Sequence, residues 1–164
     1  MTLETKTIAI LTANGVNQDD ISQIQRALIQ KRNFPKIIGA GAKLITSWNE
    51  TEWGHNFATN VSITEALGVD YDILVIPGGA RAMTVLQSTA HTQRILNSFV
   101  AANKPVLFMN SAKELLTSSG LSETSGNFKF VDSLNDENTA EILEWFASAP
   151  VVDEDEIYSD KQAA

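Results

Sequence analysis

Residues 104–116, KPVLFMNSAKELL, decide the fold. The run at 105–109 is short and apolar, which is typical of a strand buried on both faces of a parallel sheet. Ser111 and Glu114 have the Ser-x-x-Glu spacing of a capping box, which predicts a helix beginning directly behind that strand. A strand, a sharp turn and a helix in this order lift the turn residue above the sheet edge, where many α/β enzymes carry a nucleophile. Here the turn residue is Asn110.

The rest of the chain alternates predicted strands with predicted helices. Short β-branched runs predict the strands, and apolar residues at helical spacing predict the helices. The strands are expected at residues 7–13, 36–40, 72–77, 105–109 and 127–131, and the helices at 17–31, 80–87, 90–103, 111–120 and from 136 onward. Two shorter strands, 44–47 and 56–62, predict a half-exposed edge hairpin. The alternation predicts an α/β protein, a three-layer αβα sandwich around a mostly parallel sheet.

Polar residues and one glycine mark the expected helix ends. Asn17 is predicted to cap the first helix, with Asp19 and Asp20 as favourable carboxylates in its first turn. Asp136 is predicted to cap the last helix, and Gly120 to close the helix that follows Asn110.

Composition and charge exclude several classes of protein. The chain has 164 residues, 43% of them hydrophobic, and no cysteine, so disulfides, thiolate metal sites and cysteine nucleophiles are excluded. A net charge of −8 without a basic patch argues against nucleic acid and against a membrane as partners. We expect one domain over residues 1–150, an acidic tail over 151–164, a cytoplasmic location and no cofactor.

Three segments together resemble the DJ-1/PfpI superfamily, within the class I glutamine amidotransferase-like proteins. They are ILTANGVNQDD at 10–20, YDILVIPGG at 71–79 and KPVLFMNSAKELL at 104–116. The resemblance implies a flavodoxin-like fold and, in catalytic members, a cysteine at the turn, a histidine after it and an acidic residue after the first strand. By position these three fall on Asn110, Ser111 and Asn17, so none of them is present.

The loss of the cysteine also makes the chain similar to the C-terminal domain of large-subunit catalases. That domain shares a Gly-Val opening followed by acidic residues and lacks the elbow cysteine. The replacement of all three catalytic residues, at Asn17, Asn110 and Ser111, predicts a non-catalytic binding or assembly module.

Six residues are candidates for a ligand site: Asn17, Gly78, Gly79, Ala80, Asn110 and Ser111. All are expected at the carboxyl ends of parallel strands, where doubly wound sheets bind ligands. Their amides suit an anion or a carbonyl oxygen of a small-molecule ligand. The alternative is purely structural, with the glycines permitting a tight turn and Asn17 and Ser111 acting only as caps.

An enzymatic role stays open as the alternative function. A hydrolase of the intracellular protease or amidase type, or a glyoxalase-like enzyme, would need Ser111 or another group as nucleophile together with a base. The histidines, His55 and His91, are not placed by sequence to reach Ser111, and their separation predicts no metal site.

The expected partner is a second copy of the chain in a homodimer, paired through the hairpin or, as the alternative, through the first helix. The resemblance implies oligomers, and the hairpin carries Trp48, Trp53 and Phe57, which would leave an apolar strand edge exposed in a monomer.

Arg81, just after the two glycines, has two interpretations: it binds a carboxylate over the pocket, or it is an ordinary surface arginine.

Overall fold

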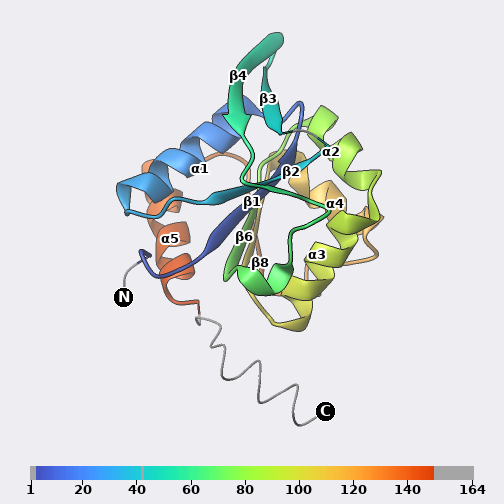
Figure 1. Cartoon of the computed structure of the whole chain (residues 1–164). Helices are drawn as coiled ribbons and strands as arrows, with labels where there is room; N and C mark the ends of the chain where they lie inside the picture. The colour runs from blue at the N-terminus through green and yellow to red at the C-terminus, as the bar shows by residue number, and fades with distance from the viewer. Residues whose placement is uncertain (1–2, 42, 150–164) are drawn as a thin grey trace.

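The computed structural model describes residues 3–41 and 43–149 and confirms the α/β fold (Figure 1). Its central sheet has six parallel strands in the order β5-β2-β1-β6-β7-β8. These strands are β1 (Ile8–Ala13), β2 (Lys36–Ala40), β5 (Val61–Ser62), β6 (Ile73–Ile76), β7 (Val106–Met109) and β8 (Phe128–Val131). Every residue of β1, β6 and β7 is buried, as expected for strands covered on both faces.

Helices cover both faces of this sheet. In Figure 1, α1 and α5 lie on one side of the strands and α2, α3 and α4 on the other. The helices are α1 (Gln18–Gln30), α2 (Ala80–Gln87), α3 (Ala90–Ala101), α4 (Glu114–Ser118) and α5 (Asp136–Ala147), with short 3-10 turns η1 (Gly68–Asp70) and η2 (Asn110–Lys113). The three layers enclose one apolar core, in which Phe99, Phe108 and Phe146 are fully buried.

The strand order determines where a site can form. From β1 the chain moves outward through β2 to β5, then returns to β6 on the other side of β1 and continues through β7 to β8. The order therefore reverses between β1 and β6, and connections that diverge from such a point leave a crevice at the carboxyl ends of the strands. The segments that follow β1, β6 and β7 meet at this edge.

The hairpin differs from its predicted bounds. Strands β3 (Leu44–Asn49) and β4 (Glu52–Ala58) form their own antiparallel two-stranded sheet, which stands out beyond the central sheet (Figure 1). The predicted strand 56–62 is in fact two strands, because β5 leaves the hairpin and pairs in parallel with β2. Thr59 interrupts the apolar series of Phe57, Val61 and Ile63 at this break, and the prediction of a single strand passed over that interruption.

Two predicted helix ends are confirmed and one is wrong. Asn17 caps α1, and Gly120 follows α4 with a left-handed φ of 72°. The last helix is capped by Asn135, not Asp136. The Asn135 side chain accepts from the backbone N–H of Asn138, and the Asn138 side chain accepts from the backbone N–H of Asn135. Asparagine and aspartate are equally good N-cap residues, so capping propensity could not distinguish Asn135 from Asp136. The expected acidic tail lies outside the described residues.

Candidate functional site

Asn110 lies at the turn between β7 and η2, where the strand-turn-helix motif would carry a nucleophile. Its φ is 50°, in the left-handed region that most residues avoid. Asparagine tolerates this conformation better than other non-glycine residues, since its short amide bonds locally. The sharp elbow geometry is therefore kept although the residue has no nucleophilic atom.

The side chain of Asn110 is held by a buried carboxylate, Asp20. Asn110 Nδ2 lies 2.7 Å from Asp20 Oδ1 and 2.9 Å from Oδ2, and the backbone N–H of Gly78 donates to Oδ2 at 2.9 Å. Asp20 is only 2% exposed. The carboxylate thus joins the connections that follow three strands: β1, β6 and β7.

The expectation that no acidic residue supports the elbow is wrong. The resemblance placed that role at Asn17, whose side chain instead accepts from the backbone N–H of Asp20 at 3.1 Å as the helix cap. The contacting carboxylate lies three residues later, after the cap. The helical spacing could have predicted that Asp20 is buried. Asp20 is four residues before Ile24 and seven before Ala27, so it lies on the buried stripe of α1.

Burial changes the acidity of this carboxyl group. Desolvation raises the pKa of Asp20 above its ordinary value. The hydrogen bonds from Asn110 and Gly78 oppose that rise because they favour the charged form, and the neighbouring Asp19 adds to it. Protonation of Asp20 therefore costs less here than in water.

Gly78 and Gly79 let the β6-α2 turn fit between the elbow and the β1-α1 turn. A Cβ on Gly78 would lie 2.9 Å from the Cβ of Asn110, and Gly79 has a φ of 126°, with the carbonyl of Gly15 2.5 Å from where its Cβ would be. The carbonyl of Gly78 also accepts from the backbone N–H of Asn17 at 2.8 Å. These glycines are required by close backbone approach.

Ser111 does not form the predicted capping box. Its Oγ accepts from the backbone N–H of Gly79 at 3.0 Å, and α4 begins only at Glu114, with no side-chain cap. The chain leaves Asn110 as a 3-10 turn, so the Ser111 hydroxyl faces the glycine turn and not its own helix. The structure thus brings Asn17, Gly78, Gly79, Asn110 and Ser111 together, while Ala80 is exposed at the start of α2.

The histidines lie outside this cluster. His55 is exposed on β4, and Nδ1 of His91 accepts from Nε of Arg94 at 3.3 Å on α3. Within residues 3–41 and 43–149, no three His, Asp or Glu side chains gather in a way that could hold a metal ion. In the same part of the chain no helix has the length and apolar character needed to cross a membrane.

The hairpin is hydrogen-bonded to residues that precede Asp20 in the β1-α1 turn and in the first turn of α1. Gln18 Oε1 accepts from Ser47 Oγ at 3.1 Å and from the backbone N–H of His55 at 2.9 Å. Asn14 Oδ1 accepts from the backbone N–H of Thr46 at 2.9 Å. The hairpin is therefore held against the β1-α1 turn and the start of α1.

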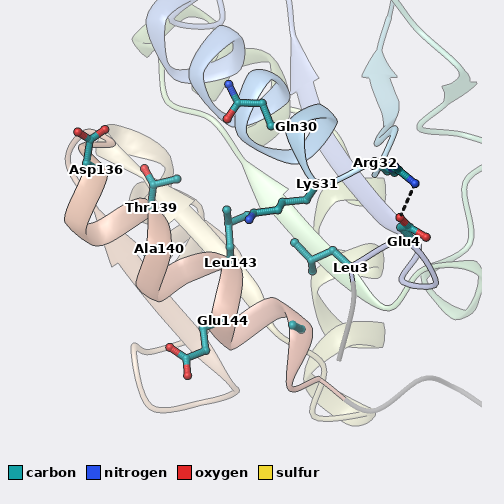
Figure 2. Close-up of a pocket in the computed structure, with 11 residues that line it drawn as sticks. Leu3, Glu4, Gln30, Lys31, Arg32, Asp136, Thr139, Ala140, Leu143 and Glu144 are labelled. Atoms are coloured by element: carbon teal, nitrogen blue, oxygen red, sulfur yellow. Dashed lines mark ion pairs between the residues drawn. The ribbon is translucent and has the colours of Figure 1, made fainter.

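A separate groove of about 720 Å³ lies between α1 and α5. Figure 2 shows Lys31 reaching from the end of α1 toward Leu143 on α5, and an ion pair between Arg32 and Glu4 beside Leu3. Helix α1 begins at the carboxyl ends of the strands and runs toward their amino ends. The part of the groove beside Lys31 and Arg32 therefore lies at the edge of the sheet opposite the elbow. None of the elbow residues lines it.

Comparisons with known proteins agree with this architecture. Drosophila melanogaster DJ-1beta superposes with a TM-score of 0.69 at 15% identity, covering 90% of this chain and 91% of that one. Schizosaccharomyces pombe DJ-1 superposes with a TM-score of 0.65 at 17% identity, covering 96% of this chain and 97% of that one. Both likenesses show the fold alone.

Two comparisons of sequence are more specific. Protein DJ-1 homolog D of Arabidopsis thaliana is 34% identical over 68 residues, which are 42% of this chain and 17% of that protein. The model of the DJ-1/PfpI family matches residues 6–163. With the elbow, the glycine turn and nearly the full length of the chain matched, this protein belongs to the DJ-1/PfpI family.

Proposed function

We propose that this protein is a non-catalytic DJ-1/PfpI family member that acts by binding or assembly. The observation that carries the proposal is Asn110 at the elbow, with its amide nitrogen bound to both oxygens of Asp20. A thiolate attacks through a free, polarisable lone pair, whereas an amide nitrogen is delocalised and here donates hydrogen bonds. The position that would hold a nucleophile instead holds a structural contact.

Ser111 is a weak replacement for the missing nucleophile. A serine hydroxyl needs a base that accepts its proton, but the partner of Ser111 Oγ is a backbone N–H, which can only donate. Both histidines lie on other elements, β4 and α3. These contacts favour binding over the alternative of a hydrolase or a glyoxalase-like enzyme.

The proposal extends to subtype and location. The absence of cysteine from the chain supports a likeness to the C-terminal domain of large-subunit catalases, which also lacks the elbow cysteine. It also fits a reducing, cytoplasmic compartment, where no disulfide is needed.

Assembly is proposed to be a homodimer formed through the hairpin. Strand β4 pairs only with β3 among the described strands, so its outer edge has unpaired backbone groups. Leu44, at the start of the hairpin, is 51% exposed. A two-fold contact would cover the same apolar edge on both copies.

Activity assays test the non-catalytic role. Purified wild-type protein is expected to show no turnover of peptides, amides or methylglyoxal above buffer, beside Ser111→Ala as the matched control. Asn110→Cys restores a nucleophile at the same backbone position and shows whether the assay would detect one. Wild-type turnover that disappears in Ser111→Ala would contradict the proposal and establish a serine enzyme.

A further inference from the structure

Arg81 is held against two tryptophans beside the elbow. It lies in the first turn of α2, two residues after Gly79. Its guanidinium carbon is 4.4 Å from the ring centre of Trp48 and 5.4 Å from that of Trp53. The two indoles meet edge to face, with ring centres 5.2 Å apart. Contacts of this kind between a guanidinium and an indole are favourable and fix the arginine's position.

The elements that carry these three side chains are fixed to one another. The backbone N–H of Trp48 donates to the carbonyl of Val16 at 2.7 Å, and its indole N–H donates to the carbonyl of Glu50 at 3.1 Å. A Cβ on Gly15 would collide with the Cβ of Arg81, so the β1-α1 turn packs directly on α2. The guanidinium is therefore pre-organised, which lowers the entropy lost when a ligand binds.

This cation has no anionic partner in the protein. Among residues 3–41 and 43–149, Arg81 makes no ion pair and its N–H groups have no acceptor, although the chain has 20 acidic residues against 12 basic ones. By contrast, Arg94 uses three of its nitrogens, bonding to His91 and to the carbonyls of Ala66 and Ile63. A cation in the first turn of a helix is also opposed by the helix dipole. The N–H groups of Arg81 therefore have no acceptor in the described part of the protein and are available to a ligand.

We propose that Arg81, Trp48 and Trp53 form a binding site for a carboxylate attached to a flat apolar body. The planar N–H edges of a guanidinium match the two oxygens of a carboxylate. Trp53 is 52% exposed, so it offers indole surface for an apolar or aromatic group next to that carboxylate. A single negative charge suits the site better than a polyanion, because the protein carries a net charge of −8.

This inference deepens the proposed binding role and rests on it. Arg81 lies beside the elbow, since the N–H of Gly79 bonds to Ser111 and the turn at Gly15 contacts Arg81. The side-chain N–H groups of Asn110 already donate to Asp20, so we assign the carboxylate to the charged donors of Arg81.

Equilibrium binding of benzoate tests the site directly. Titration followed by tryptophan fluorescence and calorimetry should show saturable binding of benzoate, and weaker binding of benzamide, which has the same ring without the charge. Arg81→Gln should bind benzoate at least about tenfold more weakly, because a charge-assisted pair is lost. Arg26→Gln, an exposed arginine on α1, is the matched control and should bind like the wild type.

A second variant keeps the test valid if Arg81→Gln unfolds. Arg81→Lys retains the charge but loses the planar fork, so it should weaken benzoate binding while circular dichroism stays unchanged. A peptide ending in phenylalanine, with a free or amidated carboxyl group, distinguishes a chain terminus from a free small acid as the source of the carboxylate. Absent benzoate binding by the wild type, or equal binding by Arg81→Gln, would overturn the inference. Neither result bears on the turnover assay, which tests the non-catalytic role separately.

Discussion

Asn110 shows how one residue can keep a local geometry and lose its chemistry. The elbow needs a residue that tolerates a φ of 50°, and asparagine does so at low cost. Its amide also gives Asp20 a hydrogen-bond donor, which a buried carboxylate requires. The pair therefore stabilises the junction of β1, β6 and β7 as a structural contact.

The ionisation of Asp20 should make stability depend on pH. Because burial raises the folded-state pKa, this group favours folding below its ordinary pKa of 3.8, and that contribution is lost as pH rises through the folded-state value. In Asp20→Asn the contribution is absent, and Asn110 can turn its amide to pair with the new side chain. The free energy of unfolding of the wild type, relative to Asp20→Asn, should therefore fall as the pH rises above about 4 and level off once Asp20 is ionised in the folded protein.

Urea unfolding at several pH values measures this difference. Glu123→Gln removes an exposed carboxylate in the loop before β8 and is the matched control, which should not reproduce the change. A difference between wild type and Asp20→Asn that is the same at every pH would contradict the argument.

The cap of α1 gives a second prediction at a single residue. Asn17→Ala removes the oxygen that accepts from the backbone N–H of Asp20, and should cost about 0.5–2 kcal/mol of stability. Asn17→Ser keeps a cap oxygen and should recover most of that loss. Denaturant midpoints report the effect, and equal midpoints for Asn17→Ala and the wild type would show that the cap contributes nothing.

Among the elements, the hairpin depends most on contacts from outside itself. An isolated two-stranded hairpin is marginal in water. Here Asn14 and Gln18, from the start of the β1-α1 connection, bond to both strands of the hairpin. The same connection carries Asp20, so the hairpin and the elbow share one support.

Gln18→Ala tests this support. Removing the side-chain oxygen leaves the backbone N–H of His55 without its acceptor, so amide exchange at His55 should quicken by roughly tenfold. Alanine favours helix formation at the start of α1, so the helix itself should not suffer. The amide of Lys104, bonded to the carbonyl of Phe99 at 2.9 Å and outside the hairpin, is the internal reference. Unchanged exchange at His55 would show that the hairpin holds its position without Gln18.

Among the described residues, the hairpin presents an outer strand edge and exposed apolar side chains through which two copies can pair. If the proposed homodimer forms, light scattering should give twice the protomer mass of 17.9 kDa. Leu44→Glu places a charge on the exposed hairpin face and should shift the population toward monomer. A charge at Val69, 54% exposed on η1, is the matched control and should leave the mass unchanged. A mass of 17.9 kDa at every concentration would exclude the dimer.

The sequence alone determined the order of elements and the identity of the elbow residue. Residues 36–40 and 80–87 match β2 and α2 residue for residue, because an apolar run bounded by turn residues and a helical repeat are both local patterns. The identification of Asn110 as the turn residue needed only the strand before it and the helix after it.

Only the tertiary structure decided which groups meet at that turn. Asp20 and Asn110 are 90 positions apart, and the partner of Ser111 lies 32 positions before it. Sequence spacing describes neighbours within about one helical turn or along one strand, whereas these contacts depend on strand order and helix rotation. The contacts of Arg81 with Trp48 and Trp53 could not be predicted from the sequence for the same reason. They join the start of α2 to a hairpin that lies outside the central sheet.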